Sequence, residues 1–135
     1  MARTIYEELD VEAEAARNLE SENECVFQET QILVQRLAEL ALPRGDAETI
    51  QALGKEGVAM AEIMTNQKEL HDEVVRNLEK AKSVAETNPI EYSAALVELL
   101  EAFKRLRLRY EADLQELRVI KSRIQELVDE STPKA

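Results

Sequence analysis

Tryptophan is absent from the 135-residue chain, glycine and proline occur three times each, and aromatic side chains make up only 4%. Sheets and their turns draw on aromatic residues, glycine and proline, so this scarcity argues against a sheet-rich fold. Cysteine occurs once, as Cys25, which excludes an intrachain disulfide and fits a reducing compartment. We therefore expect a cytoplasmic protein, with the nucleus as the alternative.

Groups that carry out catalysis or hold cofactors are equally scarce. His71 is the only histidine, and Lys68 stands where a Glu-x-x-His metal motif needs its glutamate. Acidic neighbours such as Glu29 raise the pKa of the Cys25 thiol, the opposite of what a nucleophile needs. No glycine-rich phosphate loop is present. We expect no enzyme activity, no cofactor, no metal ligand and no small-molecule substrate, with His71 half-buried and Cys25 an inert packing residue.

The charge and the lack of long apolar runs exclude two further classes. The net charge is −11, whereas a nucleic-acid-binding face relies on clustered lysine and arginine, so we expect no nucleic-acid partner. No apolar run approaches the roughly 20 residues of a membrane-spanning helix.

What the chain does contain is a helical apolar stripe in its last third. The spacing alternates between four and three residues, which keeps one side of a helix facing a partner helix, as in a coiled coil. The stripe comprises Tyr92, Leu96, Leu99, Phe103, Leu106, Tyr110, Asp113, Leu117, Ile120, Ile124 and Leu127, with Asp113 as its only departure.

Two helix-breaking segments divide the chain into nearly equal thirds. Pro43 and Gly45 end the first helix, and Asp46 is a good N-cap for the second. Asn88 then caps a third helix that begins at Pro89. We expect helices at about 3–42, 46–86 and 89–130, the second either continuous or broken at Gly54/Gly57, and a disordered tail at 131–135.

Helices of about 40 residues joined by short connections predict one domain over residues 1–135. The fold class is all-α, an elongated antiparallel three-helix bundle with up-down-up coiled-coil packing. The first helix has its stripe at Ile5, Leu9, Glu12, Ala16, Leu19, Asn23, Val26, Thr30, Leu33, Leu37 and Leu40. The second has a weaker stripe at Ile50, Leu53, Gly57, Met60, Met64, Gln67, His71, Val74, Leu78, Ala81 and Ala85, flanked by Ile63 and Leu70.

Charged residues of the first and third helices predict an interhelical charge match. If these two helices pair in parallel, residues about 15 to 20 positions from the start of each helix lie at the same level. Attraction between opposite charges at this level would then fix the register of the two helices. The acidic members are Glu20, Glu22 and Glu24, and the basic members are Lys104, Arg105, Arg107 and Arg109; the basic cluster extends to Arg118, Lys121 and Arg123.

Apolar residues in excess of what the second helix covers predict a partner interface. Uncovered leucines on a soluble helix mark an association surface. The predicted interface comprises Leu33, Leu37, Leu40, Leu100, Leu108, Leu114 and Val128. We expect a non-catalytic structural or interaction subunit that pairs with itself or with other helical proteins in a larger cytoplasmic complex of cytoskeletal, kinetochore, vesicle-tethering or ciliary-transport type. The alternative is a small acidic helical chaperone for a secreted or assembling client protein.

Overall fold

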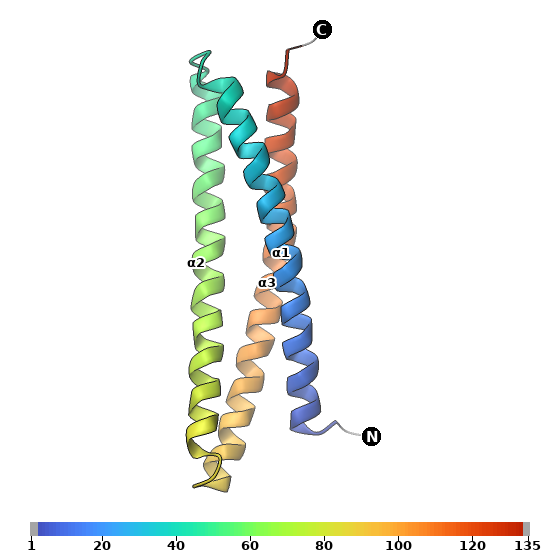
Figure 1. Cartoon of the computed structure of the whole chain (residues 1–135), viewed down its shortest axis with the longest axis vertical. Coiled ribbons are helices and arrows are strands. Elements are labelled where there is room, and N and C mark those ends of the chain that lie inside the picture. Colours follow the sequence, from blue (N-terminus) through green and yellow to red (C-terminus); the bar gives the residue numbers. More distant parts are fainter. Residues whose placement is uncertain (1–2, 134–135) are drawn as a thin grey trace. The chain divides into compact units, whose positions relative to one another are not determined.

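A computed structural model describes residues 3–133 and consists of three long helices (Figure 1). They are α1 (Ile5–Ala41), α2 (Ala47–Val84) and α3 (Pro89–Ser131), with 37, 38 and 43 residues. No strand occurs within residues 3–133. The helices pack mainly through contacts of α3 with α1 and with α2. The predicted all-α helical bundle is therefore confirmed.

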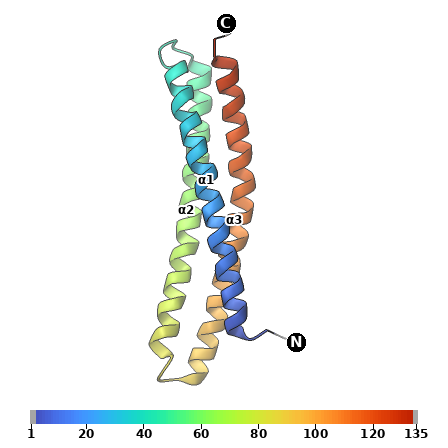
Figure 2. The same cartoon turned by 45° about the vertical axis from the view of Figure 1, so that its right-hand side comes forward.

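Short turns join α1 to α2 and α2 to α3 (Figure 2). Capping groups at these turns explain where α2 and α3 begin. The Asp46 carboxylate accepts hydrogen bonds from the Thr49 hydroxyl at 2.7 Å and the Thr49 backbone N–H at 3.2 Å, which lowers the pKa of Asp46. Gly45 just before it has a positive φ of 62°, a conformation that glycine adopts at little cost. At the second turn the Asn88 side chain accepts from the Glu91 N–H at 3.1 Å.

The α2 helix runs without a break through Gly54 and Gly57, so the expected interruption there is absent. Each glycine costs only about 1 kcal/mol relative to alanine inside a helix, which the packing of an amphipathic face outweighs. At the other end of the chain Ser131 belongs to α3 and is buried, so the disorder predicted from residue 131 is wrong for this residue. Lys134 and Ala135, also assigned to that tail, lie outside the described residues.

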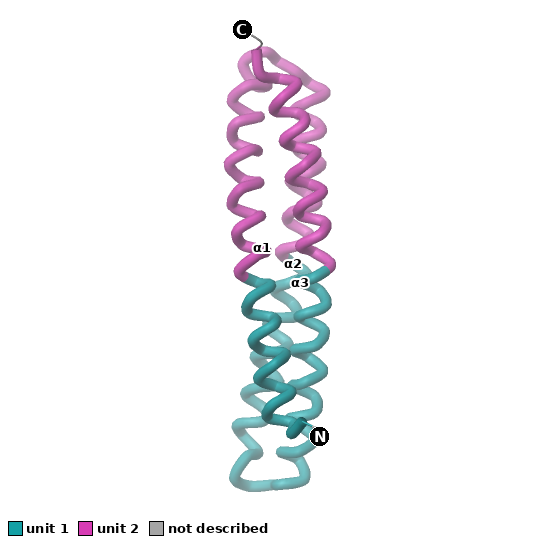
Figure 3. The backbone as a smooth tube through the Cα atoms, turned by 90° about the vertical axis from the view of Figure 1, so that its right-hand side faces the viewer, with its two compact units in different colours: residues 1–20, 65–111 teal, residues 21–64, 112–135 magenta. Residues whose placement is uncertain are grey.

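The helices divide between two compact units, each containing a segment of all three (Figure 3). Unit 1 includes residues 3–20 and 65–111, and unit 2 includes residues 21–64 and 112–133. No sequence feature predicted this division.

Each unit has an apolar core of its own. In unit 1, α1 and α2 contribute two buried residues each and α3 contributes the rest; the buried members are Leu9, Ala16, Val74, Ala81, Ala95, Leu96, Leu99, Leu100, Ala102, Leu106 and Tyr110. The buried core of unit 2 comprises Leu37, Met60, Ile63, Leu117, Ile120, Ile124 and Val128. In both units α3 supplies residues on a wide arc, because it packs against two helices.

The stripes predicted for the first and third helices are buried or half-buried at every position. The stripe predicted for the second helix is correct only in part. Its column at residues 53, 60, 67, 74 and 81 faces the core, but Gly57, Met64, His71, Leu78 and Ala85 are exposed. The second core column is displaced by one residue and includes Ile63 and Leu70. A displacement of one residue is a rotation of about 100° around the helix.

Candidate protein-interaction surface

The structure places most of the predicted interface residues inside the chain's own bundle. Leu37, Leu100, Leu114 and Val128 are at most 5% exposed, Leu33 and Leu40 are half-buried, and only Leu108, at 55%, is exposed. This placement corrects the sequence-based interface. Because α3 packs against both α1 and α2, its residues outside the main stripe are also covered: Leu100 belongs to the core of unit 1 and Val128 to that of unit 2.

The predicted charge match between α1 and α3 exists, but it uses other acidic residues. Arg107 pairs with Glu12 in unit 1 and also with Glu111 at 3.0 Å. Lys121 pairs with Glu29 in unit 2. None of the ion pairs within residues 3–133 involves the predicted acidic members, Glu20, Glu22 and Glu24. The predicted capping residues indicate where each helix begins, but they do not determine how far α1 is displaced along α3.

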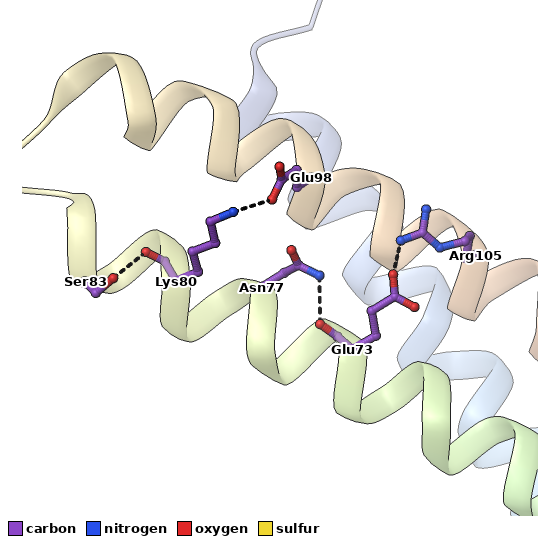
Figure 4. A network of polar contacts seen from close by, with 6 residues as sticks. All are labelled: Glu73, Asn77, Lys80, Ser83, Glu98 and Arg105. Atoms are coloured by element: carbon purple, nitrogen blue, oxygen red, sulfur yellow. Dashed lines mark hydrogen bonds and ion pairs between the residues drawn. The ribbon is translucent and has the colours of Figure 1, made fainter.

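The remaining basic members of the predicted match have different partners. Arg105 pairs with Glu73 of α2 instead of α1 (Figure 4). The Lys104 ammonium lies 3.9 Å from the Glu101 carboxylate of the same helix, and Arg109 also has an interaction partner. The same network ties Lys80 to Glu98 at 3.0 Å, so opposite charges also link α2 to α3 in unit 1.

Two adjoining hollows lie between α1 and α3 in unit 2, and both include Gln125. The first has a volume of about 470 Å³ and is lined by Val26, Arg118, Lys121, Ser122, Gln125 and Glu126. The second has a volume of about 400 Å³ and is lined by Leu33, Arg36, Gln125, Val128, Asp129, Thr132 and Pro133. We call the two together the unit 2 groove.

The unit 2 groove combines an apolar floor with a polar rim. Val26 and Leu33 belong to the α1 stripe and are half-buried, so the hollows leave part of their apolar surface accessible, whereas Val128 is 3% exposed beneath the second hollow. Leu33 and Val128 were both predicted as interface residues from the sequence.

Charged side chains of the groove differ in whether they are neutralised. Glu29 pairs with Lys121, and hydrogen bonding to this ammonium holds the pKa of Glu29 below its usual value. Asp129 accepts a hydrogen bond from the Gln125 side-chain amide at 3.0 Å. By contrast, no ion pair within residues 3–133 involves Arg36, Arg118, Glu126 or Asp129, and both arginines are exposed.

The two residues considered for chemistry lie on the surface. His71 is exposed on α2 rather than half-buried, because it belongs to the displaced column. Cys25 is also exposed, so it is not a packing residue. Its thiol donates a hydrogen bond to Glu29 at 3.1 Å, and this bond and the carboxylate charge raise its pKa, in the predicted direction.

Within residues 3–133, no three His, Cys, Asp or Glu side chains converge as a metal site requires, and no helix is long and apolar enough to span a membrane. Sequence reasoning named Arg118 and Lys121 as basic residues but missed that they border a groove with Ser122 and Gln125. Their positions next to stripe residues of α3 could have indicated that they border the contact with α1.

No protein family, curated protein or solved structure gave a significant match to the chain.

Proposed function

We propose that the protein is a non-catalytic interaction subunit that binds a helix of a partner protein in the unit 2 groove. The observation that supports this most is the partly open apolar floor at the half-buried Val26 and Leu33. Apolar surface accessible between two helices is what an amphipathic helix covers in helix-in-groove binding. The setting that we propose is a cytoplasmic assembly built from helical proteins.

The dimensions of the groove suit a short stretch of helix. Val26 and Arg36 lie ten positions apart on α1, which corresponds to about 15 Å at a rise of 1.5 Å per residue. About three turns of a partner helix fit alongside this length. Such a helix would convert the three helical segments of unit 2 into a four-helix arrangement, a common solution for burying apolar stripes.

A site-specific photocrosslinker at Gln125 tests the proposal in cells that naturally express the protein. Gln125 is exposed and lines both hollows, whereas Ser93, exposed on α3 in unit 1, is the matched control position. We expect crosslinked adducts at Gln125 that contain a helical segment of another protein, and none at Ser93. Equal adducts at both positions, or none at Gln125, contradict the proposal.

The lifetime of the complex separates a subunit from the chaperone alternative. A subunit stays with its partner through purification in fixed stoichiometry, whereas a chaperone releases its client. We expect the Gln125 adduct partner to copurify with the uncrosslinked protein through size-exclusion chromatography. Recovery of the partner only after crosslinking favours the chaperone.

A further inference from the structure

Two of the three tyrosines meet in unit 1, although they are 86 positions apart in the sequence. Tyr6 lies in the first turn of α1 and Tyr92 in the first turn of α3, and the Tyr6 hydroxyl donates a hydrogen bond to the Tyr92 hydroxyl at 3.0 Å. We propose that this pair is a site of oxidative modification, at which a one-electron oxidant joins the two rings as dityrosine. The site belongs to unit 1 and does not depend on the unit 2 groove.

The tyrosine pair combines access for an oxidant with restricted movement. Tyr6 is 54% exposed, so a small oxidant in solution reaches its ring. Tyr92 is half-buried and packs against the unit 1 core, which limits the movement of its ring. The third tyrosine, Tyr110, is 4% exposed in the same core and is shielded from solvent. Because the chain has no tryptophan, Tyr6 and Tyr92 are its accessible aromatic side chains for one-electron oxidation.

The coupling reaction requires a peroxide as oxidant. Each tyrosine gives up one electron and its hydroxyl proton, and the two phenoxyl radicals join through the ring carbons next to the carbons that carry the hydroxyls. The hydrogens on these ring carbons then move to the oxygens, which restores both phenols. Hydrogen peroxide, activated by a haem peroxidase, accepts the two electrons and two protons and leaves as two molecules of water. The new bond joins two carbons, so thiols that reduce disulfides do not cleave it.

Proximity favours coupling within the chain over coupling between chains. The carbons that couple are bonded to the hydroxyl-bearing carbons, so the contact between the two hydroxyls brings them close together. Exposed side chains change rotamer within picoseconds to nanoseconds, which lets the Tyr6 ring reach the geometry for coupling. A group that is held beside its reaction partner reacts as if at a high concentration. Coupling within the chain is therefore insensitive to dilution of the protein.

The modification ties the start of α1 to α3. In unit 1, α1 contributes only Leu9 and Ala16 to the buried core, so few apolar contacts hold this segment. The crosslink closes a loop of 86 positions and removes conformations that are open to the unfolded chain, as a disulfide does. We expect it to raise the melting midpoint of the chain by about 10 °C or more.

Photo-oxidation of the purified full chain with a ruthenium bipyridyl sensitiser and persulfate tests the proposal, with mass spectrometry of tryptic peptides as the measurement. All proteins in the comparison carry Cys25→Ser, so that the exposed thiol does not consume the radicals. We expect a linked product of the peptides 4–17 and 83–104 that weighs two hydrogen atoms less than their sum, at a yield that does not change on dilution. Tyr6→Phe and Tyr92→Phe should each abolish this product.

Moving the tyrosine along α1 supplies the matched control. Tyr6→Phe with Val11→Tyr keeps the number of tyrosines and places the ring at another exposed position of unit 1, where we expect no link to Tyr92. An equal yield from position 11 overturns the proposal, because coupling then follows exposure alone. A product that forms only between chains and declines on dilution overturns it as well. An unchanged melting midpoint of the linked chain contradicts the tie between α1 and α3.

Discussion

Two leucines of α3 give opposite predictions for the same substitution. Leu100 is 5% exposed within the unit 1 core, whereas Leu108, eight positions further along, is 55% exposed. Truncation of a buried leucine to alanine removes apolar contacts and leaves a cavity, which costs about 3 kcal/mol. The same truncation at an exposed position changes the free energy of unfolding by about 0.5 kcal/mol or less.

Thermal unfolding followed by circular dichroism measures the difference. With an unfolding entropy of about 2.1 cal/mol/K per residue over 135 residues, about 3 kcal/mol lowers the melting midpoint by roughly 10 °C. We expect this shift for Leu100→Ala and a shift of no more than about 2 °C for Leu108→Ala. Equal shifts for the two variants, or a larger one for Leu108→Ala, refute the assignment of Leu100 to the core.

Three further predictions concern single sites. Gly54→Ala should raise the free energy of unfolding by about 1 kcal/mol, because the new Cβ meets nothing within 4 Å; Gly45→Ala should lower it by about as much at the positive φ. Chemical denaturation measures both, and changes of the same sign contradict this reading. Because the pKa of Asp46 is lowered in the fold, the wild type should be more stable than Asp46→Ala at neutral pH, and this advantage should shrink as the pH falls through that lowered pKa. An advantage that is constant with pH, measured by melting midpoints, argues against the cap. Glu29→Gln should lower the raised pKa of Cys25 and speed its alkylation by iodoacetamide at pH values below it, as measured by mass spectrometry; an unchanged rate shows that Glu29 does not control the thiol.

The sequence predicted best those features that depend on local rules. The α3 stripe and the α1 stripe were assigned residue by residue, because a 4-3 spacing of large apolar residues leaves little choice of face. The helix starts at Ala47 and Pro89 follow from Asp46 and Asn88, whose side chains accept backbone hydrogen bonds within four residues.

Features that depend on how the helices pack against one another were not predictable in the same way. Small and polar residues in α2 leave two neighbouring columns almost equally apolar, and the sequence favoured the one that contains His71 over the one that contains Ile63. The off-stripe leucines of α3 looked uncovered because one stripe suffices for one neighbour, whereas α3 has two. The pairing of Lys121 with Glu29 depends on how far the helices are displaced along each other, which no single residue encodes.

The groove itself was the least visible feature, because its lining residues are ordinary surface side chains of two helices far apart in the sequence. Leu33 and Val128 were predicted as interface residues because of surplus apolar area, whereas the hollow that they line together was not predicted. A sequence pattern predicts which face of a single helix is apolar. A groove depends on the distance between two packed helices, which such a pattern does not give.

Blocking the groove tests the central claim most directly. Ser122→Trp places a large side chain in the first hollow from an exposed position, and Ser93→Trp makes the same change on α3 outside the groove. Affinity purification from cells that naturally express the protein, with quantitative mass spectrometry, compares the proteins retained by each variant. We predict that Ser122→Trp loses a helical partner that the wild type and Ser93→Trp retain. Retention of the same proteins by all three, with Ser122→Trp folded as judged by circular dichroism, contradicts it.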